Sequence, residues 1–276
     1  MIGRFQYGVE MPVSASSDGS VWLRHERPPR DRQLSRDQIV GAAVPVLDAE
    51  GHRGLSMRRI ASDLGVTAGS LYWYVRTKDD VLELALDRVL GEVRADPDEP
   101  NWRRGLAGLA RSTRAMLLRH RWALRELTIR PNLGPNAFTL AETGLRLLSR
   151  AGFAGADLDA AMATVHDQVV GAVIAEVAWH DTLTRMRESG VEWSEHATTA
   201  YLRDVAERHP LLARRMAAGR KIEVERDSER RFEFALTCLL EGLAATRHTV
   251  TGADPTANAD RLLTPDPRRP LTADAG

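Results

Sequence analysis

Apolar residues recur at intervals of three and four over most of the chain from residue 34 to residue 248. This spacing places them on one face of an α-helix. It predicts helices at residues 35–50, 57–64, 67–75, 79–93, 102–120, 137–151, 157–187, 198–207 and 227–248. The sequence shows no useful stretch of the period-two alternation that indicates a strand, and no internal repeat. The pattern therefore predicts an all-α fold.

Polar and small residues mark the ends of the first predicted helices. Ser35, Ser56 and Thr67 each precede a helical run and are suited to be N-caps, since their side-chain oxygens can accept a backbone N–H of the first turn. Gly65 permits a tight reversal between the second and third helices, as in a helix-turn-helix. Pro45 lies inside the first helix, where we expect a bend but not a break.

Composition divides the chain into four segments. Residues 1–33 lack a regular period and contain Ser, Gly and Pro clusters, so we expect a flexible arm. Its arginines either are solvated or touch DNA. We expect a three-helix domain with the helix-turn-helix at residues 34–95, a second, all-helical domain at residues 96–250, and a disordered, proline-containing tail at residues 251–276.

Overall composition favours a cytoplasmic protein. The chain has 276 residues, a formal net charge of zero and 28% charged residues. It has no uninterrupted apolar run of about 18 residues, so we expect no membrane span, and its first residues lack the apolar core of a secretory signal. The single cysteine, Cys238, fits a reducing compartment and lies in an apolar helical pattern typical of a core thiol.

Positive charge is concentrated around the predicted helix-turn-helix. Residues 51–78 contain five basic side chains and one acidic side chain, which gives a local charge of +4: Arg53, Arg58, Arg59, Arg76 and Lys78 against Asp63. Elsewhere lysine occurs only at position 221. A local basic surface on a neutral chain is typical of a DNA-contact region.

The third helix has the chemistry of a DNA-reading helix. It begins with four small residues, which let a backbone approach base edges in the major groove. A tyrosine hydroxyl and a lysine at the next helix start can hold phosphates. We expect DNA contacts from Arg58, Thr67, Ala68, Gly69, Ser70, Tyr72, Trp73, Tyr74 and Lys78. Trp73 and Tyr74 have a second interpretation as packing residues, and Arg59 as a solvated charge.

The stretch RRIASDLGVTAGSLYWYVRTKDDVLELALD closely resembles the DNA-binding segment of tetracycline-repressor (TetR/AcrR) family regulators. LTIRPN, AETGLRLLSRAGF and DQVVGAVIAE resemble, more weakly, the second domain of the tetracycline repressor subgroup. The resemblance places Arg58, Ala68, Gly69, Ser70, Tyr72 and Lys78 on DNA-contact positions. It implies a homodimer on double-stranded operator DNA, with recognition helices in successive major grooves about 34–36 Å apart. It also implies a repressor that a small-molecule effector releases.

The resemblance also implies that residues 34–95 are a DNA-binding domain and residues 96–250 a ligand-binding and dimerisation domain, with an effector site in the second of these. The expected ligand-binding residues are Thr113, Glu126, Arg130, Phe138, Thr143, Leu145, Asp167 and Val170. In the tetracycline-binding relatives, two histidines fall on the positions of Glu126 and Asp167, and a threonine falls on Ile129. These departures argue against a drug–metal chelate. We therefore expect an organic, polar or cationic multi-ring ligand, with no metal and no cofactor.

Catalytic signatures are absent from the sequence, which predicts that the protein is not an enzyme: neither phosphate-binding loops, H-E-x-x-H, paired C-x-x-C nor G-x-S-x-G occurs. Three alternatives stay open. A DNA-binding protein without effector would show no thermal shift with any small molecule. An enzyme carrying the helix-turn-helix as a packing unit would not lose DNA binding on Tyr72→Ala. An activator cannot be separated from a repressor by sequence.

Overall fold

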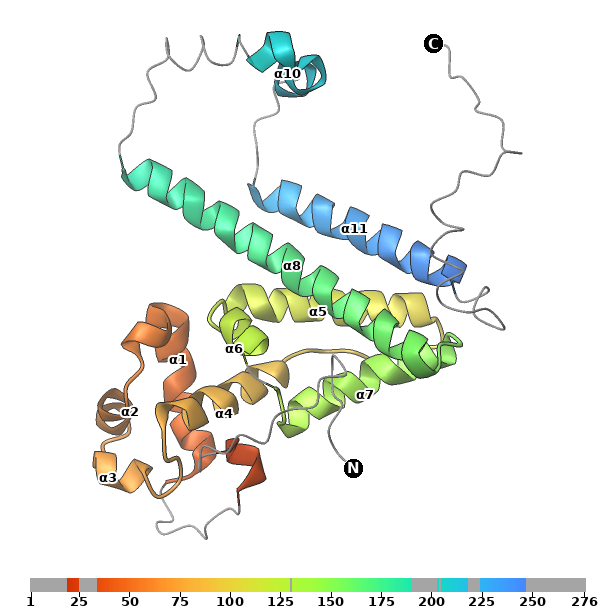
Figure 1. Ribbon diagram of the computed structural model, residues 1–276. Coiled ribbons are helices and arrows are strands. Elements are labelled where there is room, and N and C mark those ends of the chain that lie inside the picture. Colours follow the sequence, from red (N-terminus) through yellow and green to blue (C-terminus); the bar gives the residue numbers. More distant parts are fainter. Residues whose placement is uncertain are drawn as a thin grey trace.

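The computed structural model describes residues 19–24, 34–129, 131–189, 203, 205–217 and 224–246, and within these ranges the regular structure is helical (Figure 1). The elements are η1 (Val21–Leu23), α1 (Arg36–Gly54), α2 (Met57–Asp63), α3 (Ala68–Leu71), α4 (Lys78–Leu90), α5 (Trp102–Arg119), α6 (Ala123–Ile129), α7 (Pro135–Arg150), α8 (Gly155–Glu188), α10 (Pro210–Ala217) and α11 (Val224–Thr246). The predicted all-α fold class is confirmed.

Hydroxyl side chains begin the four helices of the first domain. In each case the side-chain oxygen accepts the backbone N–H three residues later, which satisfies a donor that the first helical turn leaves open. These N-caps are Ser35, Ser56, Thr67 and Thr77. The first three caps were predicted from the sequence. The fourth was not, and α4 begins one residue earlier than expected.

A glycine turn separates α2 from α3. Gly65 has a φ of +65°, a conformation that glycine adopts without steric cost. The N–H of Val66 donates to the carbonyl of Ala61 (2.9 Å), and the N–H of Gly65 donates to the carbonyl of Ser62 (3.1 Å). This pair of hydrogen bonds closes the end of α2 as a Schellman motif. The turn reverses the chain and completes the predicted helix-turn-helix.

The continuous part of α1 ends close to the position predicted from the sequence, where a helix was expected over residues 35–50. Gly51, with φ +63° and ψ −160°, is the residue within α1 whose backbone angles are not helical. The helix therefore continues through Pro45 without a break, as expected, and its backbone leaves the helical path at Gly51. Residues 52–54 form a separate short turn after this break.

The second domain is built around α8. This helix packs against α5, α7 and α11, and Figure 1 shows α8 and α11 running side by side above α5. α4 connects the domains because it packs on α1 in the first domain and on α6 and α7 in the second. By length and mean hydropathy (1.2) alone, residues 155–186 of α8 could cross a membrane. One such helix is weak evidence for a membrane span, since helices of globular domains can have the same length and composition, and α8 packs against three other helices.

Several short elements differ from the sequence prediction. α6 and α10 were not predicted, since neither is long enough to show a clear apolar period. η1 gives residues 21–23 regular structure within the segment expected to be a flexible arm. The predicted helix at 198–207 lies mostly outside the described residues, as do the rest of the arm and the tail from residue 251.

Candidate DNA interface and effector domain

The surface of α3 is divided into a buried side and an exposed side. Leu71 is fully buried in the core, and so is Val75 in the turn that follows α3. Thr67, Gly69 and Ser70 are exposed, and Tyr72, the first residue after α3, is 49% exposed. An edge of small polar residues next to a tyrosine is thus open to solvent. Such an edge can lie close to the base edges in a major groove.

The third helix is shorter than the predicted run of residues 67–75. Regular α-helix ends at Leu71, and hydrogen-bonded turns follow: the N–H groups of Tyr74 and Val75 both donate to the carbonyl of Leu71 (2.9 and 3.0 Å). Trp73 and Tyr74 are half-buried, and Tyr74 packs against the core. Tyr74 therefore has a structural role, and the exposed edge centres on Thr67 to Tyr72.

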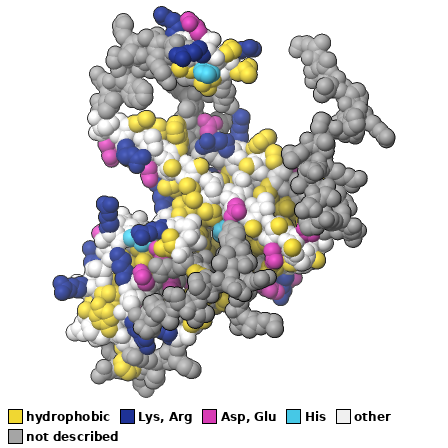
Figure 2. Space-filling model, in the orientation of Figure 1, with side chains coloured by type: hydrophobic (Ala, Val, Ile, Leu, Met, Phe, Trp, Pro, Cys, Tyr) yellow, Lys and Arg dark blue, Asp and Glu magenta, His cyan; other side chains and the backbone are white. Residues whose placement is uncertain are grey.

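The basic residues around α3 have different surroundings. Arg58 is exposed, whereas Arg59 pairs with Asp63 (3.2 Å) on the solvent side of α2. Lys78 is half-buried at the start of α4, and its Nζ donates to the carbonyl oxygen of His52 (2.5 Å). Figure 2 shows Lys and Arg side chains gathered at the end of the molecule that α1, α2 and α3 form. The local positive charge predicted from the sequence is therefore on the side that presents α3.

Asp80 fixes the turn between α3 and α4. Its carboxylate accepts the backbone N–H of Arg76 (2.7 Å) and the hydroxyl of Thr77 (3.0 Å), and it pairs with Arg24. Burial alone would raise the pKa of Asp80. The hydrogen bonds from Arg24, Arg76 and Thr77 outweigh burial and lower the pKa below its usual value. Asp80 is therefore ionised at neutral pH and holds the segment that follows α3.

The described part of the N-terminal segment is docked on α4. Glu83 accepts the hydroxyl of Ser20 (2.7 Å) and the N–H of Val21 (3.0 Å) through the same carboxylate oxygen, and Val21 is buried. The expectation of a flexible arm is therefore wrong for residues 19–24. Arg24, one of the arginines considered for DNA contact, is instead an ion-pair partner of Asp80.

Polar contacts join the end of α1 to the second domain. The Nε2 atom of His52 lies 2.7 Å from Oε1 of Glu126. Asp48 accepts Nε1–H of Trp122 (2.8 Å) and lies 2.7 Å from Nδ1 of His120. These partners are more than 70 residues apart in the chain, so sequence spacing gave no signal for them. They fix the first domain against α5 and α6.

Glu92 extends this interdomain cluster beyond α4. Its Oε2 atom lies 3.1 Å from Nε2 of His120 and also pairs with Arg119 (2.5 Å). Burial raises the pKa of Glu92, but the contacts with His120 and then Arg119 outweigh burial and lower the pKa. His120 is thus held between two carboxylates, Asp48 from α1 and Glu92 from the segment after α4.

The predicted effector residues have unequal surroundings. Thr143 and Val170 are buried, Thr113 and Leu145 are half-buried, and Phe138 and Asp167 are exposed. Glu126 is 1% exposed and bonded to His52, and Arg130 lies outside the described residues. The seven described residues therefore do not share one enclosed environment. In the described part of the chain no group of three or more His, Cys, Asp or Glu side chains is arranged to hold a metal.

His166 on α8 adds a neutral polar group beside the predicted site residue Asp167. Burial lowers the pKa of His166, and the charge of Asp167 raises it by a smaller amount. The histidine is therefore uncharged at neutral pH. An uncharged imidazole can donate one hydrogen bond and accept another, which suits it to a polar organic ligand.

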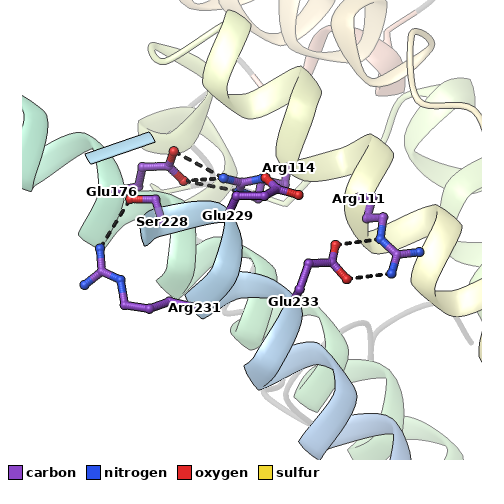
Figure 3. Close-up of polar contacts among 7 residues, drawn as sticks. All are labelled: Arg111, Arg114, Glu176, Ser228, Glu229, Arg231 and Glu233. Carbon is purple, nitrogen blue, oxygen red and sulfur yellow. Dashed lines mark hydrogen bonds and ion pairs between the residues drawn. The ribbon is translucent and has the colours of Figure 1, made fainter. Parts of the chain in front are cut away.

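A buried arginine joins three helices of the second domain (Figure 3). Arg114 of α5 donates to both carboxylate oxygens of Glu176 on α8 (3.0–3.2 Å) and pairs with Glu229 on α11. Burial alone would lower the pKa of Arg114, but the two carboxylates outweigh burial and raise the pKa. One turn away, the more exposed Arg111 forms two hydrogen bonds of 2.6 Å with Glu233.

Comparison with known proteins places both domains. The family model for bacterial regulatory proteins of the tetR family matches residues 39–85. The model for the tetracyclin repressor-like C-terminal domain matches residues 96–247, more than half of the chain.

Three similar proteins cover most of the chain. An HTH-type transcriptional regulator of Saccharopolyspora erythraea is 40% identical over 85% of this chain and 95% of its own length. The HTH-type transcriptional repressor DrrR1 of Streptomyces coeruleorubidus is 34% identical over 81% of this chain and 83% of its own. The structure of ActR from Streptomyces coelicolor in complex with (S)-DNPA is 30% identical, covers 80% of this chain and all of ActR, and has a TM-score of 0.62. The helix-turn-helix, the helical second domain and these matches show that the chain belongs to the TetR family of bacterial transcription regulators.

Proposed function

We propose that the protein is a cytoplasmic, homodimeric repressor that binds a double-stranded DNA operator and is released from it by a small organic effector. One observation carries the proposal: the polar residues of α3 are exposed to solvent, while Leu71 and Val75 are buried in the core of the first domain. The two buried side chains anchor α3 in the first domain, and the exposed residues can contact DNA. The members of the family are transcription regulators, which favours this function over catalysis.

The edge supplies both kinds of contact that operator recognition needs. Gly69 and Ser70 bring little bulk, so the α3 backbone can approach base edges in the major groove. The Tyr72 hydroxyl and the Lys78 ammonium, beside this edge, suit phosphate oxygens. An ammonium carries three N–H donors, so the bond from Lys78 to His52 leaves donors for a phosphate.

The DNA test uses the purified protein and the DNA upstream of its own gene. We expect binding at low salt in the absence of ligand, measured by fluorescence anisotropy. Tyr72→Ala weakens binding at least about fivefold, because a lost contact at a DNA interface costs on the order of 1–3 kcal/mol. Tyr72→Phe keeps the ring and removes only the hydroxyl, so it shows how much of the affinity comes from each.

The matched control is Arg59→Ala. Arg59 is paired with Asp63 on the solvent face of α2, so this variant also removes a positive charge near α3 but should bind DNA within about twofold of wild type. Equal losses for Tyr72→Ala and Arg59→Ala would mean that general charge and not the α3 edge binds DNA.

Exposed apolar side chains on α8 and α11 support a homodimer. Ile174, Trp179 and Met186 on α8 are each more than a third exposed, and Phe234 on α11 is 72% exposed. Figure 2 shows hydrophobic side chains spread over the region that α8 and α5 occupy in Figure 1. Two such helices can pair with the same two helices of a second copy across a twofold axis, giving a four-helix interface.

The dimer test places a charge on this face. Phe234→Glu should give a monomer by sedimentation velocity, and operator affinity should fall because two recognition helices no longer bind as a unit. Glu241→Ala, an exposed change on the same helix, is the control. A wild-type protein that sediments as a monomer at every concentration would exclude the dimer.

The class of effector is supported by the ligand-bound relative. ActR has been solved with (S)-DNPA, and the second domain of the present chain matches the tetracyclin repressor-like family. We therefore propose a polar, multi-ring organic effector that binds the free and DNA-bound conformations with different affinity. Tetracycline and (S)-DNPA are the first two probes, tested for release of operator DNA and for a thermal shift. If a wide panel of such compounds produced neither effect, the protein would be a DNA-binding protein without an effector.

A further inference from the structure

His52 lies between the effector domain and the predicted DNA-contact surface. It follows Gly51, whose non-helical backbone separates residues 52–54 from the rest of α1. The position of His52 is therefore not fixed by the continuous helix that precedes it. Its side chain is only 19% exposed, so neighbouring groups hold it.

Two contacts hold His52, one from each side. The ring Nε2 lies 2.7 Å from Oε1 of Glu126, a fully buried carboxylate of α6 in the second domain. The main-chain carbonyl of the same residue accepts Nζ of Lys78 at 2.5 Å. A single residue thus links a side chain of the effector domain to the lysine that begins α4.

We propose that His52 is a positioning residue that transmits the position of Glu126 to Lys78, and thereby adjusts a phosphate contact of the DNA-binding surface. The inference rests on the proposed function. When Glu126 holds the imidazole, the carbonyl of His52 stays within reach of the ammonium and orients it. A movement of α6 that withdraws Glu126 frees the short turn after Gly51, and Lys78 loses its orienting acceptor.

Only two contacts, Glu126 to His52 and His52 to Lys78, connect the domains in this proposal, so Lys78 can change its orientation without a rearrangement of the whole first domain. Lys78 follows Thr77, the N-cap of α4, so its side chain begins beside the helix N-terminus. Backbone N–H groups at that point attract phosphate. A change in the direction of one ammonium group therefore alters the positive charge beside the first turn of α4.

The chain permits a direct test because it contains only two lysines, Lys78 and Lys221. A short pulse of acetic anhydride labels amines, and peptide mass spectrometry gives the acetylation rate of Lys78 relative to Lys221. This measurement needs neither DNA nor an effector. We expect His52→Ala and Glu126→Ala each to raise the relative rate of Lys78 by about fivefold, the factor that corresponds to one lost hydrogen bond. The double variant should show no further rise, because both changes remove the same contact.

Two variants separate positioning from general loosening of the domain contact. His52→Gln keeps an N–H donor on the side chain and should restore most of the protection of Lys78. Trp122→Phe removes a different interdomain hydrogen bond, to Asp48, and should leave the rate of Lys78 unchanged. Unchanged labelling in both alanine variants would overturn the proposal, and so would an equal rise in Trp122→Phe.

Operator binding then tests the link to DNA. Lys78→Ala should reduce the slope of log affinity against log salt by about 1, the effect of one lost phosphate contact. His52→Ala should reduce the slope in the same direction, whereas Trp122→Phe should not. Faster labelling of Lys78 with an unchanged salt slope would overturn the coupling and leave the repressor proposal intact. A wild-type protein that binds no operator would overturn the repressor proposal, while the labelling result would still decide the contact.

Discussion

Replacement of Arg114 tests the packing of the effector domain. Arg114 is 9% exposed, and its guanidinium donates hydrogen bonds to Glu176 of α8 at 3.0–3.2 Å and pairs with Glu229 of α11. Its charged group also lies 4.8 Å from the centre of the Phe232 ring, a cation–π distance. Arg114→Ala removes all three contacts and leaves Glu176 without its cation.

The cost follows from the exposure of the two carboxylates. The side chain of Glu176 is 17% exposed, and removal of one partner of a buried ion pair costs about 3–5 kcal/mol. The partial exposure places this pair near the lower limit, about 3 kcal/mol. Glu229 is 56% exposed, so its pairing adds at most about 1 kcal/mol. A loss of about 3 kcal/mol lowers the melting temperature of a chain of this size by about 6–12 °C.

The assay is thermal unfolding followed by circular dichroism at a fixed protein concentration, since dimerisation would make the melting temperature depend on concentration. Arg111→Ala is the matched control. It removes an ion pair between the same two helices, α5 and α11, but Arg111 is 52% exposed and Glu233 is 33% exposed. We expect this control to lose at most about 1 kcal/mol. Equal destabilisation by the two variants would refute the argument from burial.

Two further variants probe α4. Gly134→Ala places a Cβ 2.2 Å from Oδ1 of Asp87, so the carboxylate must move; we expect a loss of about 1–3 kcal/mol in urea denaturation. Asp80 has a lowered pKa in the folded protein, so its stabilising contribution is complete above the unfolded pKa of about 4 and is lost as pH falls through the lower, folded value. Asp80→Asn should therefore be less stable than wild type at pH 7 and nearer to wild type at the acid end. Parallel stability curves for the two proteins between pH 7 and pH 3 would contradict this reasoning.

Local signals in the sequence predicted the helix-turn-helix closely. Ser35, Ser56 and Thr67 begin helices as predicted. N-capping joins a hydroxyl to an N–H group only three residues later, so it can be recognised in the sequence. The tight reversal at Gly65 was also predictable, because the positive φ that it needs depends on the type of a single residue. The exposed side chain of Tyr72 also agrees with the predicted outer face of α3.

Contacts between distant segments could not be predicted in this way. His52 and Glu126 are 74 residues apart. The sequence around each residue does not show whether the two side chains bond to each other or lie separately on the surface. The docking of Val21 beside Glu83 likewise depends on a surface that exists only after α4 has packed. The predicted effector residues came from resemblance alone, and the described structure distributes them over exposed and buried positions.

The three carboxylates on one face of α4 explain how the two domains and the N-terminal segment act as a unit. Asp80, Glu83 and Asp87 follow at intervals of three and four residues, so they lie on the same side of the helix. Each is bound by a different part of the chain. Asp80 holds the turn after α3, and Glu83 holds the segment around Val21. Asp87 accepts the N–H of Ala137 (3.0 Å) at the start of α7.

Burial acts differently on Asp80 and Asp87, the first and last of these three carboxylates on α4. Burial raises the pKa of Asp87, against the hydrogen bonds from Ala137 and Asn136, which lower the pKa by less. The ionised carboxylate is thus retained at a cost that the contacts at α7 only partly offset. Asp80 and Asp87 therefore differ in what dominates their pKa values: hydrogen bonds outweigh burial at Asp80, and burial outweighs hydrogen bonds at Asp87.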